Sequence, residues 1–110
     1  MNKLIKNRWI EALRSGQFPQ GYEALQANGK FCCLGVVCEL VKGEIALIVH
    51  PDLLADGVVQ YGNFYETGML PFEVEDYVNL GKTRQEQLIN MNDEERIGFD
   101  EIADWIEKNL

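Results

Sequence analysis

The apolar segment FCCLGVVC, residues 31–38, constrains the fold of this chain more than any other stretch. With the following ELVKG it has the length of a short helix, and Gly43 supplies a normal helix end. Because this helix is apolar nearly all round, it has to be buried. Gly35 lies inside it at a cost of about 1 kcal/mol against alanine, which indicates close approach of a neighbouring element. The sequence therefore predicts a buried helix over residues 33–42.

Four further helices are predicted from the spacing of apolar residues and from end signals. They span residues 4–14, 71–81, 83–91 and 99–110. Pro71 suits a first helical position, and Gly81 is expected to close that helix. Thr83 and Glu86 have the spacing of a capping box that opens the next one. Gly98 is expected to act as a permissive cap for the last helix.

The pair Asn28-Gly29 is the strongest local signal for a two-residue β-hairpin turn. It separates two short segments that contain apolar residues. We therefore expect a hairpin in which residues 22–27 pair with residues 30–33.

The middle of the chain is rich in β-branched and aromatic residues and in glycine, which favours strands. Two strands are expected there, over residues 45–49 and 57–65, around a turn near Pro51-Asp52. The chain shows neither a repeat nor a linker. The whole pattern predicts a single α+β domain over residues 1–110, with a small antiparallel β-sheet packed with about five helices.

Charge is distributed unevenly along the chain, whose formal net charge is −8. Residues 1–42 carry six bases and three acids, whereas residues 43–110 carry four bases and fifteen acids. Such a surface repels polyanions, so no nucleic acid and no membrane is expected as a partner unless the small basic helix at the start of the chain is used. A basic protein is electrostatically easier to bind. Because no membrane span or secretory signal is visible, we expect a reducing cytoplasmic setting.

Three cysteines and the sole histidine lie within nineteen residues, at Cys32, Cys33, Cys38 and His50. On paper these four soft ligands suit zinc, but the paired C-x2-C spacing of structural zinc sites is absent. An odd number of cysteines so close together also does not resemble a disulfide framework. We therefore expect free, buried thiols that act as small hydrophobes, with no metal and no cofactor.

Catalytic residues are not indicated by any motif. A helix that begins near Cys33 would lower the pKa of a thiol at its amino end, but nothing places His50 beside it as a base. Pairs of carboxylates arise by chance in a chain with eighteen acids. Neither a phosphate-binding loop nor a hydrolase elbow is present. A cysteine-dependent enzyme is therefore the third and least favoured hypothesis.

A small-molecule site is the second hypothesis, with a pocket in which aromatic rings and polar groups converge. Its expected members are Lys30, Tyr61, Phe64, Tyr65, Asn92 and Asp93. Asn92 and Asp93 lie between two predicted helices, where a loop can present them to a ligand. Residues of these types between helices also serve as turn and cap residues, and that alternative stays open.

At KFCCLGVVCEL and again at IGFDEIADWIEKNL the chain resembles a family of small uncharacterised proteins encoded by tailed bacteriophages and prophages. The matching positions are Trp9 to Gly16, Gln20, Phe31 to Leu40, Leu70, Pro71, Val74, Asn92, Asp93 and Phe99 to Glu107. The departures are Met91 in place of leucine, an inserted EERI after Asp93, and Gly98 in place of a serine cap.

The resemblance carries no activity with it, but it implies a viral origin and action in the host cell cytoplasm. Small phage proteins without catalytic motifs often occupy a host component, so the leading hypothesis is a non-enzymatic binding protein that acts on a host protein, in counter-defence or host takeover. The alternative is a protein that binds or sequesters a nucleotide or metabolite. Self-association through Trp9 or Trp105 is left open, although such residues belong to the core by default.

Overall fold

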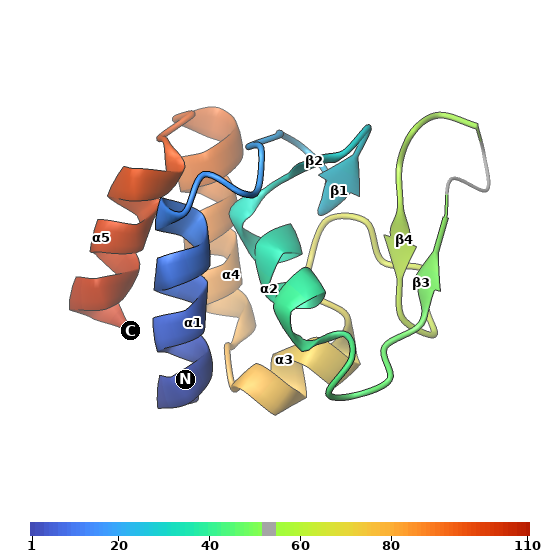
Figure 1. Ribbon diagram of the computed structural model, residues 1–110, viewed down its shortest axis with the longest axis horizontal. Helices are drawn as coiled ribbons and strands as arrows, with labels where there is room; N and C mark the ends of the chain where they lie inside the picture. The colour runs from blue at the N-terminus through green and yellow to red at the C-terminus, as the bar shows by residue number, and fades with distance from the viewer. Residues whose placement is uncertain (52–54) are drawn as a thin grey trace.

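The computed structural model describes residues 1–51 and 55–110, and within them five α-helices, a π-helix and two small antiparallel sheets (Figure 1). The helices are α1 (Lys3–Arg14), α2 (Cys33–Val41), α3 (Phe72–Val78), α4 (Lys82–Ile89), the π-helix η1 (Asn90–Glu94) and α5 (Phe99–Asn109). The strands are β1 (Gln26–Ala27), β2 (Lys30–Phe31), β3 (Val49–His50) and β4 (Gln60–Tyr61). The predicted α+β class and the hairpin are confirmed.

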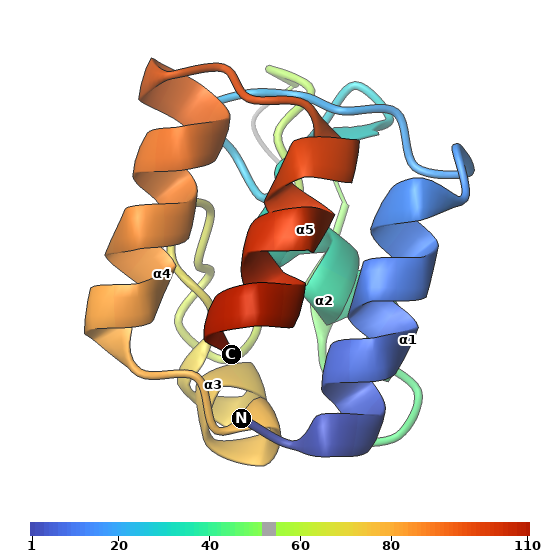
Figure 2. The same cartoon turned by 90° about the vertical axis from the view of Figure 1, so that its left-hand side faces the viewer.

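The predicted buried helix is α2, and it lies at the centre of the molecule. It contacts α1, α3, α4 and strand β2. Seven of its residues are buried: Cys33, Leu34, Gly35, Val36, Val37, Cys38 and Val41. Figure 2 shows α1, α5 and α4 side by side in front of it. Because α2 is apolar on nearly every side, only a position enclosed by other elements removes its surface from water.

Gly35 is the point of closest approach on α2. A Cβ atom built on this glycine would lie 1.7 Å from the carbonyl oxygen of Leu25, far inside van der Waals contact. The backbone before strand β1 therefore rests directly on the helix. The close approach predicted from a glycine within a helix is confirmed, and it explains why the helix tolerates that residue.

The apolar stripe of α1 is buried at Ile5, Trp9, Ile10 and Leu13. Trp9 is fully buried, and its indole nitrogen donates to the backbone oxygen of Cys33 at 2.9 Å. Trp9 therefore belongs to the core. On the outside, Arg14 pairs with Asp104 at 2.6 Å and with Glu107 at 3.4 Å, and so ties α1 to α5.

The hairpin turns at Asn28 and Gly29, whose φ angles of 53° and 77° are those of a type I′ turn. Its register pairs Gln26 with Phe31 and Ala27 with Lys30. It is shorter than predicted, because the residues before Gln26 leave the extended conformation. Glu23 has a φ of 66°, in the left-handed region, so residues 22–25 do not continue the strand.

Strands β3 and β4 form a second sheet, in which Val49 pairs with Tyr61 and His50 with Gln60. Both are shorter than predicted, because Ala46 and Gly62 have positive φ angles that end the extended runs. The two sheets are separate, where one was expected, and an isolated bridge between Ala27 and Val58 joins them. Of the turn predicted near Pro51-Asp52, Asp52 lies outside the described residues.

The ends of the third and fourth helices differ from the prediction. Helix α3 ends at Val78, followed by Asn79 in the left-handed region, so Gly81 does not close it. Gly81 instead caps the start of α4 in an extended conformation. Thr83 consequently lies inside α4 and no side chain caps the helix, so the predicted capping box is wrong. Pro71 precedes the first helical residue of α3.

Gly98 caps α5 without a side-chain hydrogen bond, as expected for a glycine. The buried residues of α5 are Phe99, Ile102, Ala103 and Ile106. Across residues 1–51 and 55–110, no helix has both the length and the apolar character that crossing a membrane requires.

Candidate functional site

Tyr61, predicted to line a pocket, lies in the core. Its side chain is fully buried on strand β4. The hydroxyl donates to Gln26 Oε1 at 2.5 Å and also lies 3.1 Å from Glu39 Oε2. Burial, followed by the neighbouring Glu39 carboxylate, raises the pKa of Tyr61 well above its ordinary value. The structure therefore gives Tyr61 a structural position between the two sheets and α2.

Asn92 is fully buried in the π-helix η1, whereas a loop was expected to present it. Its Oδ1 accepts from Gln20 Nε2 at 3.0 Å and from the backbone nitrogen of Cys33 at 3.3 Å. Its Nδ2 donates to Gly21 O at 3.0 Å and to Asp93 Oδ1 at 2.7 Å. The sequence could not reveal this role, because it depends on residues some sixty to seventy positions earlier.

All three cysteines are free and buried. Burial raises the pKa of the Cys32 thiol to about 11, and raises the pKa values of Cys33 and Cys38 as well. The helix end at Cys33 was expected to lower the pKa of a thiol there, but desolvation of the charged form outweighs that effect. These thiols are therefore protonated at neutral pH, which makes them poor nucleophiles.

His50 lies beside aromatic and backbone groups. Its ring stacks on Tyr65 with centroids 4.1 Å apart, and its Nε2 lies 3.0 Å from Gly62 O. Within residues 1–51 and 55–110, no three His, Cys, Asp or Glu side chains are grouped so as to hold a metal ion.

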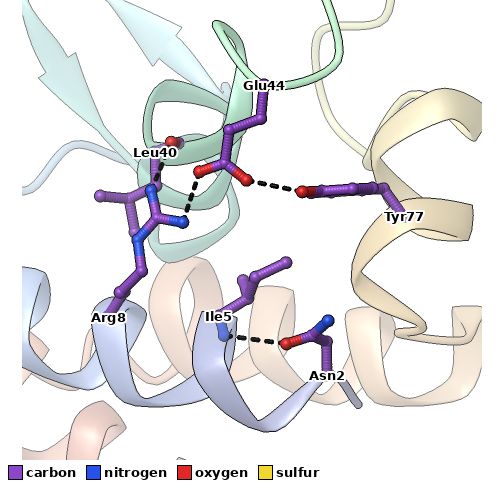
Figure 3. A network of polar contacts seen from close by, with 6 residues as sticks. All are labelled: Asn2, Ile5, Arg8, Leu40, Glu44 and Tyr77. Atoms are coloured by element: carbon purple, nitrogen blue, oxygen red, sulfur yellow. Dashed lines mark hydrogen bonds and ion pairs between the residues drawn. The ribbon is translucent and has the colours of Figure 1, made fainter.

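One exposed polar network joins three helices (Figure 3). Arg8 of α1 pairs with Glu44, just beyond α2, and donates to Leu40 O at 2.9 Å. Tyr77 of α3 donates to the other oxygen of Glu44 at 2.6 Å. The Tyr77 hydrogen bond, and then Arg8, lower the pKa of Glu44. Because the charged partners already satisfy one another, the network serves as a clamp between α1, α2 and α3.

Four exposed apolar side chains come from the segment between residues 48 and 72, which includes β3, β4 and the start of α3. We call the group the aromatic cluster; its members are Ile48, Phe64, Tyr65 and Phe72. Phe64 is 77% exposed and Phe72 is 68% exposed, whereas most other large apolar residues are buried. Exposed aromatic residues that gather in one place indicate an interaction surface more strongly than scattered ones do.

The turn at Gly62 brings the backbone at the positions of the aromatic cluster close together. Gly62 donates its backbone N–H to Ile48 O at 2.8 Å, and Tyr65 is fixed by its stack on His50. A Cβ on Gly62 would lie 3.0 Å from the Cβ of Pro71, the residue directly before Phe72. Gly62 has a φ of 80°, so this turn requires a residue that tolerates the left-handed region.

The chain segment that carries the aromatic cluster is acidic. Residues 43–81 contain seven acids and neither lysine nor arginine. Glu73 Oε2 accepts from the backbone nitrogen of Asn63 at 3.2 Å, which places a carboxylate beside the turn. The cluster therefore has at least one carboxylate, that of Glu73, at its edge.

The sequence predicted that Phe64 and Tyr65 line a pocket together with Tyr61. In the structure Tyr61 is buried, whereas Phe64 and Tyr65 are exposed. The prediction from sequence also missed Ile48 and Phe72. A signal was present for Phe72, because it stands outside the apolar stripe of its helix, whose buried residues are Val74 and Val78. Lys30 is exposed on the hairpin, where it lines a separate cavity.

Fold and site together define a small α+β protein with a buried cysteine helix and a surface cluster of aromatic residues. A family model described as "Domain of unknown function (DUF8296)" matches residues 1–80, and the chain belongs to this family. The matched part includes the hairpin, α2 and the aromatic cluster, and ends before α4. Neither a curated protein nor a solved structure matches the chain.

Proposed function

We propose that this chain is a non-enzymatic binding protein that contacts another protein through the aromatic cluster. The observation that carries the proposal is the exposure of Ile48, Phe64, Tyr65 and Phe72 around a single turn. Aromatic residues are enriched in the cores of protein interfaces, where a few of them supply most of the binding energy. Burial of a side chain such as Phe64 contributes about 1.5–3 kcal/mol.

The partner is a protein with an apolar recess flanked by lysine or arginine. This choice follows from charge complementarity, since the segment 43–81 carries seven acids and no lysine or arginine. A basic rim on the partner speeds encounter and fixes the register of the complex, while the aromatic side chains slow its dissociation. Binding should therefore weaken as the salt concentration rises.

The resemblance to phage and prophage proteins supplies the setting of this proposal. In that setting the partner is a bacterial host protein in the host cell cytoplasm, and the outcome of binding is counter-defence or host takeover. The protonated, buried thiols support a binding role over cysteine-dependent catalysis, because a nucleophilic cysteine needs an accessible thiolate.

Affinity capture from a bacterial lysate with three forms of the protein tests the proposal. The wild type is compared with the double variant Phe64→Ala/Tyr65→Ala and with Leu4→Ala. Leu4 is a matched control, because it is 76% exposed on α1, outside the aromatic cluster. We expect the wild type and Leu4→Ala to retain one stoichiometric basic protein that the double variant loses. Equal capture by all three forms, or no stoichiometric partner, contradicts the proposal.

A further inference from the structure

A cavity of about 260 Å³ opens beside the hairpin, apart from the aromatic cluster. It lies between the segment 20–24 and the turn of the hairpin, and Tyr22, Asn28 and Lys30 contribute to its wall. Ligand pockets range upward from about 300 Å³, so this cavity suits a metabolite or part of one rather than a macromolecule.

Lys30 places a positive charge at this cavity. Lys30 is exposed, and among residues 1–51 and 55–110 no carboxylate forms an ion pair with it. Tyr22, which lines the same cavity, has the guanidinium of Arg96 over its ring at 4.2 Å from the centroid. In a chain of net charge −8, a cavity lined by a lysine and by no aspartate or glutamate is a local exception among the described residues.

The backbone beside Lys30 offers three successive hydrogen-bond donors. In the described part of the chain, the N–H groups of Tyr22, Glu23 and Ala24 find no acceptor. The amides on either side are bonded: Gly21 donates to Phe31 O at 2.7 Å and Leu25 donates to Thr67 O at 2.6 Å. Glu23 is in the left-handed region, and successive amides around such a residue form anion-binding concavities.

Hydrogen bonds hold Gln20 and Gly21, which line the cavity, in place. Asn92 Nδ2 holds the carbonyl of Gly21, and Gln20 Nε2 donates to Asn92 Oδ1 and to Ile97 O at 2.8 Å. Gly21 also packs against Lys30, since a Cβ on the glycine would lie 2.8 Å from Lys30 Cβ. A ligand therefore meets donors that are already positioned, which lowers the entropic cost of binding.

We infer that this cavity binds a small organic anion that carries a phosphate or carboxylate group. Lys30 pairs with the anionic group, and the free amides of residues 22–24 donate to it. The exposed carboxylate of Glu23 is the charge that opposes binding, because it belongs to the same loop. The site is separate from the aromatic cluster. A failure to bind an anion would therefore not contradict the proposed protein partner, and the absence of a protein partner would not contradict the anion site.

The test is a titration of the 15N-labelled protein followed by NMR, with inorganic phosphate, citrate and adenosine monophosphate as separate probes. Sodium chloride at matched ionic strength is the control for unspecific charge effects. The expected result is saturable shifts of the amides of Tyr22, Glu23, Ala24 and Lys30 with at least one probe. The three probes distinguish a phosphate from a carboxylate as the recognised group.

Three variants make the result specific. Lys30→Ala should weaken binding at least about tenfold, because it removes a charge-assisted hydrogen bond. Glu23→Gln should tighten binding, and Lys108→Ala, an exposed lysine on α5, should leave the affinity unchanged. Equal affinity for wild type and Lys30→Ala overturns the inference, as do shifts that follow sodium chloride alone.

Discussion

The side-chain oxygen of Asn92 accepts a hydrogen bond from the backbone nitrogen of Cys33 at 3.3 Å, and so joins the π-helix η1 to the first turn of α2. The first N–H groups of a helix have no partner within it, and one left buried without a partner is costly. The same amide also holds the carbonyl of Gly21. Asn92 therefore fixes three segments that are distant in sequence.

Asn92→Ala should destabilise the protein by about 2–3 kcal/mol, because it leaves buried groups at Cys33 and Gly21 without their partners. Urea unfolding measures the change. Asn90→Ala is the matched control: Asn90 is exposed, and among the described residues its side chain bonds only to Glu95, so a loss within about 0.5 kcal/mol is expected. A loss in Asn92→Ala no greater than that of the control contradicts the role given to Asn92.

Gly35→Ala should cost about 3 kcal/mol or more, since the added Cβ meets the carbonyl oxygen of Leu25 at 1.7 Å and backbone has to move. Gly43→Ala provides the comparison, because a Cβ there has no neighbour within 4 Å in the described part of the chain. That variant should change the unfolding free energy by less than about 1 kcal/mol. Thermal or urea unfolding of both variants measures the difference, and equal stabilities would refute the close approach of Leu25 to Gly35.

The three thiols should react slowly with Ellman's reagent in the native state at pH 8, and rapidly once the protein is unfolded in urea. The reason is burial, which raises the pKa of Cys32 from 9.0 to about 11 and raises the others too. The pKa values of the thiols are higher in the folded than in the unfolded protein. The thiols therefore contribute fully to the free energy of unfolding below pH 9, and this contribution is lost as the pH rises toward 11. Stoichiometric labelling of the native protein within seconds would show the thiols to be accessible.

Glu44→Gln should lower stability at pH 7, and the deficit should shrink as the pH falls toward 3. Tyr77 and Arg8 depress the pKa of Glu44 below 4.5, so its contribution is present above the unfolded value and is lost as the pH falls through the folded one. Urea unfolding at both pH values, with the exposed Glu86→Gln as control, gives the comparison. A deficit in Glu44→Gln that persists undiminished at pH 3 would argue against the clamp in Figure 3.

The sequence was sufficient wherever a local pattern decided the structure. The apolar run around Gly35 predicted α2 and its close neighbour, and Asn28-Gly29 predicted the hairpin turn. The prediction failed where two nearby residues could each begin a helix. Thr83 matched a capping box, but Gly81 already supplies the extended residue that starts α4, so Thr83 falls within the helix.

The site residues were harder to predict because their roles depend on long-range packing. Asn92 and Asp93 have turn-forming side chains, yet a π-helix carries them and Asn92 bonds to residues far away in sequence. Tyr61 and Tyr65 are both aromatic residues in one stretch, but one is buried and the other is 52% exposed. Only the fold distinguishes them.

Site-specific photocrosslinking tests the proposed protein partner most directly. A benzoylphenylalanine in place of Phe64, and separately in place of Leu4, is irradiated in a bacterial lysate, and the adducts are identified by mass spectrometry. Position 64 should yield an adduct with one basic protein, and position 4 should yield none with that protein. An absence of any adduct at position 64, an adduct there only with a second copy of this chain, or equal labelling of the partner from position 4 would contradict binding through the aromatic cluster.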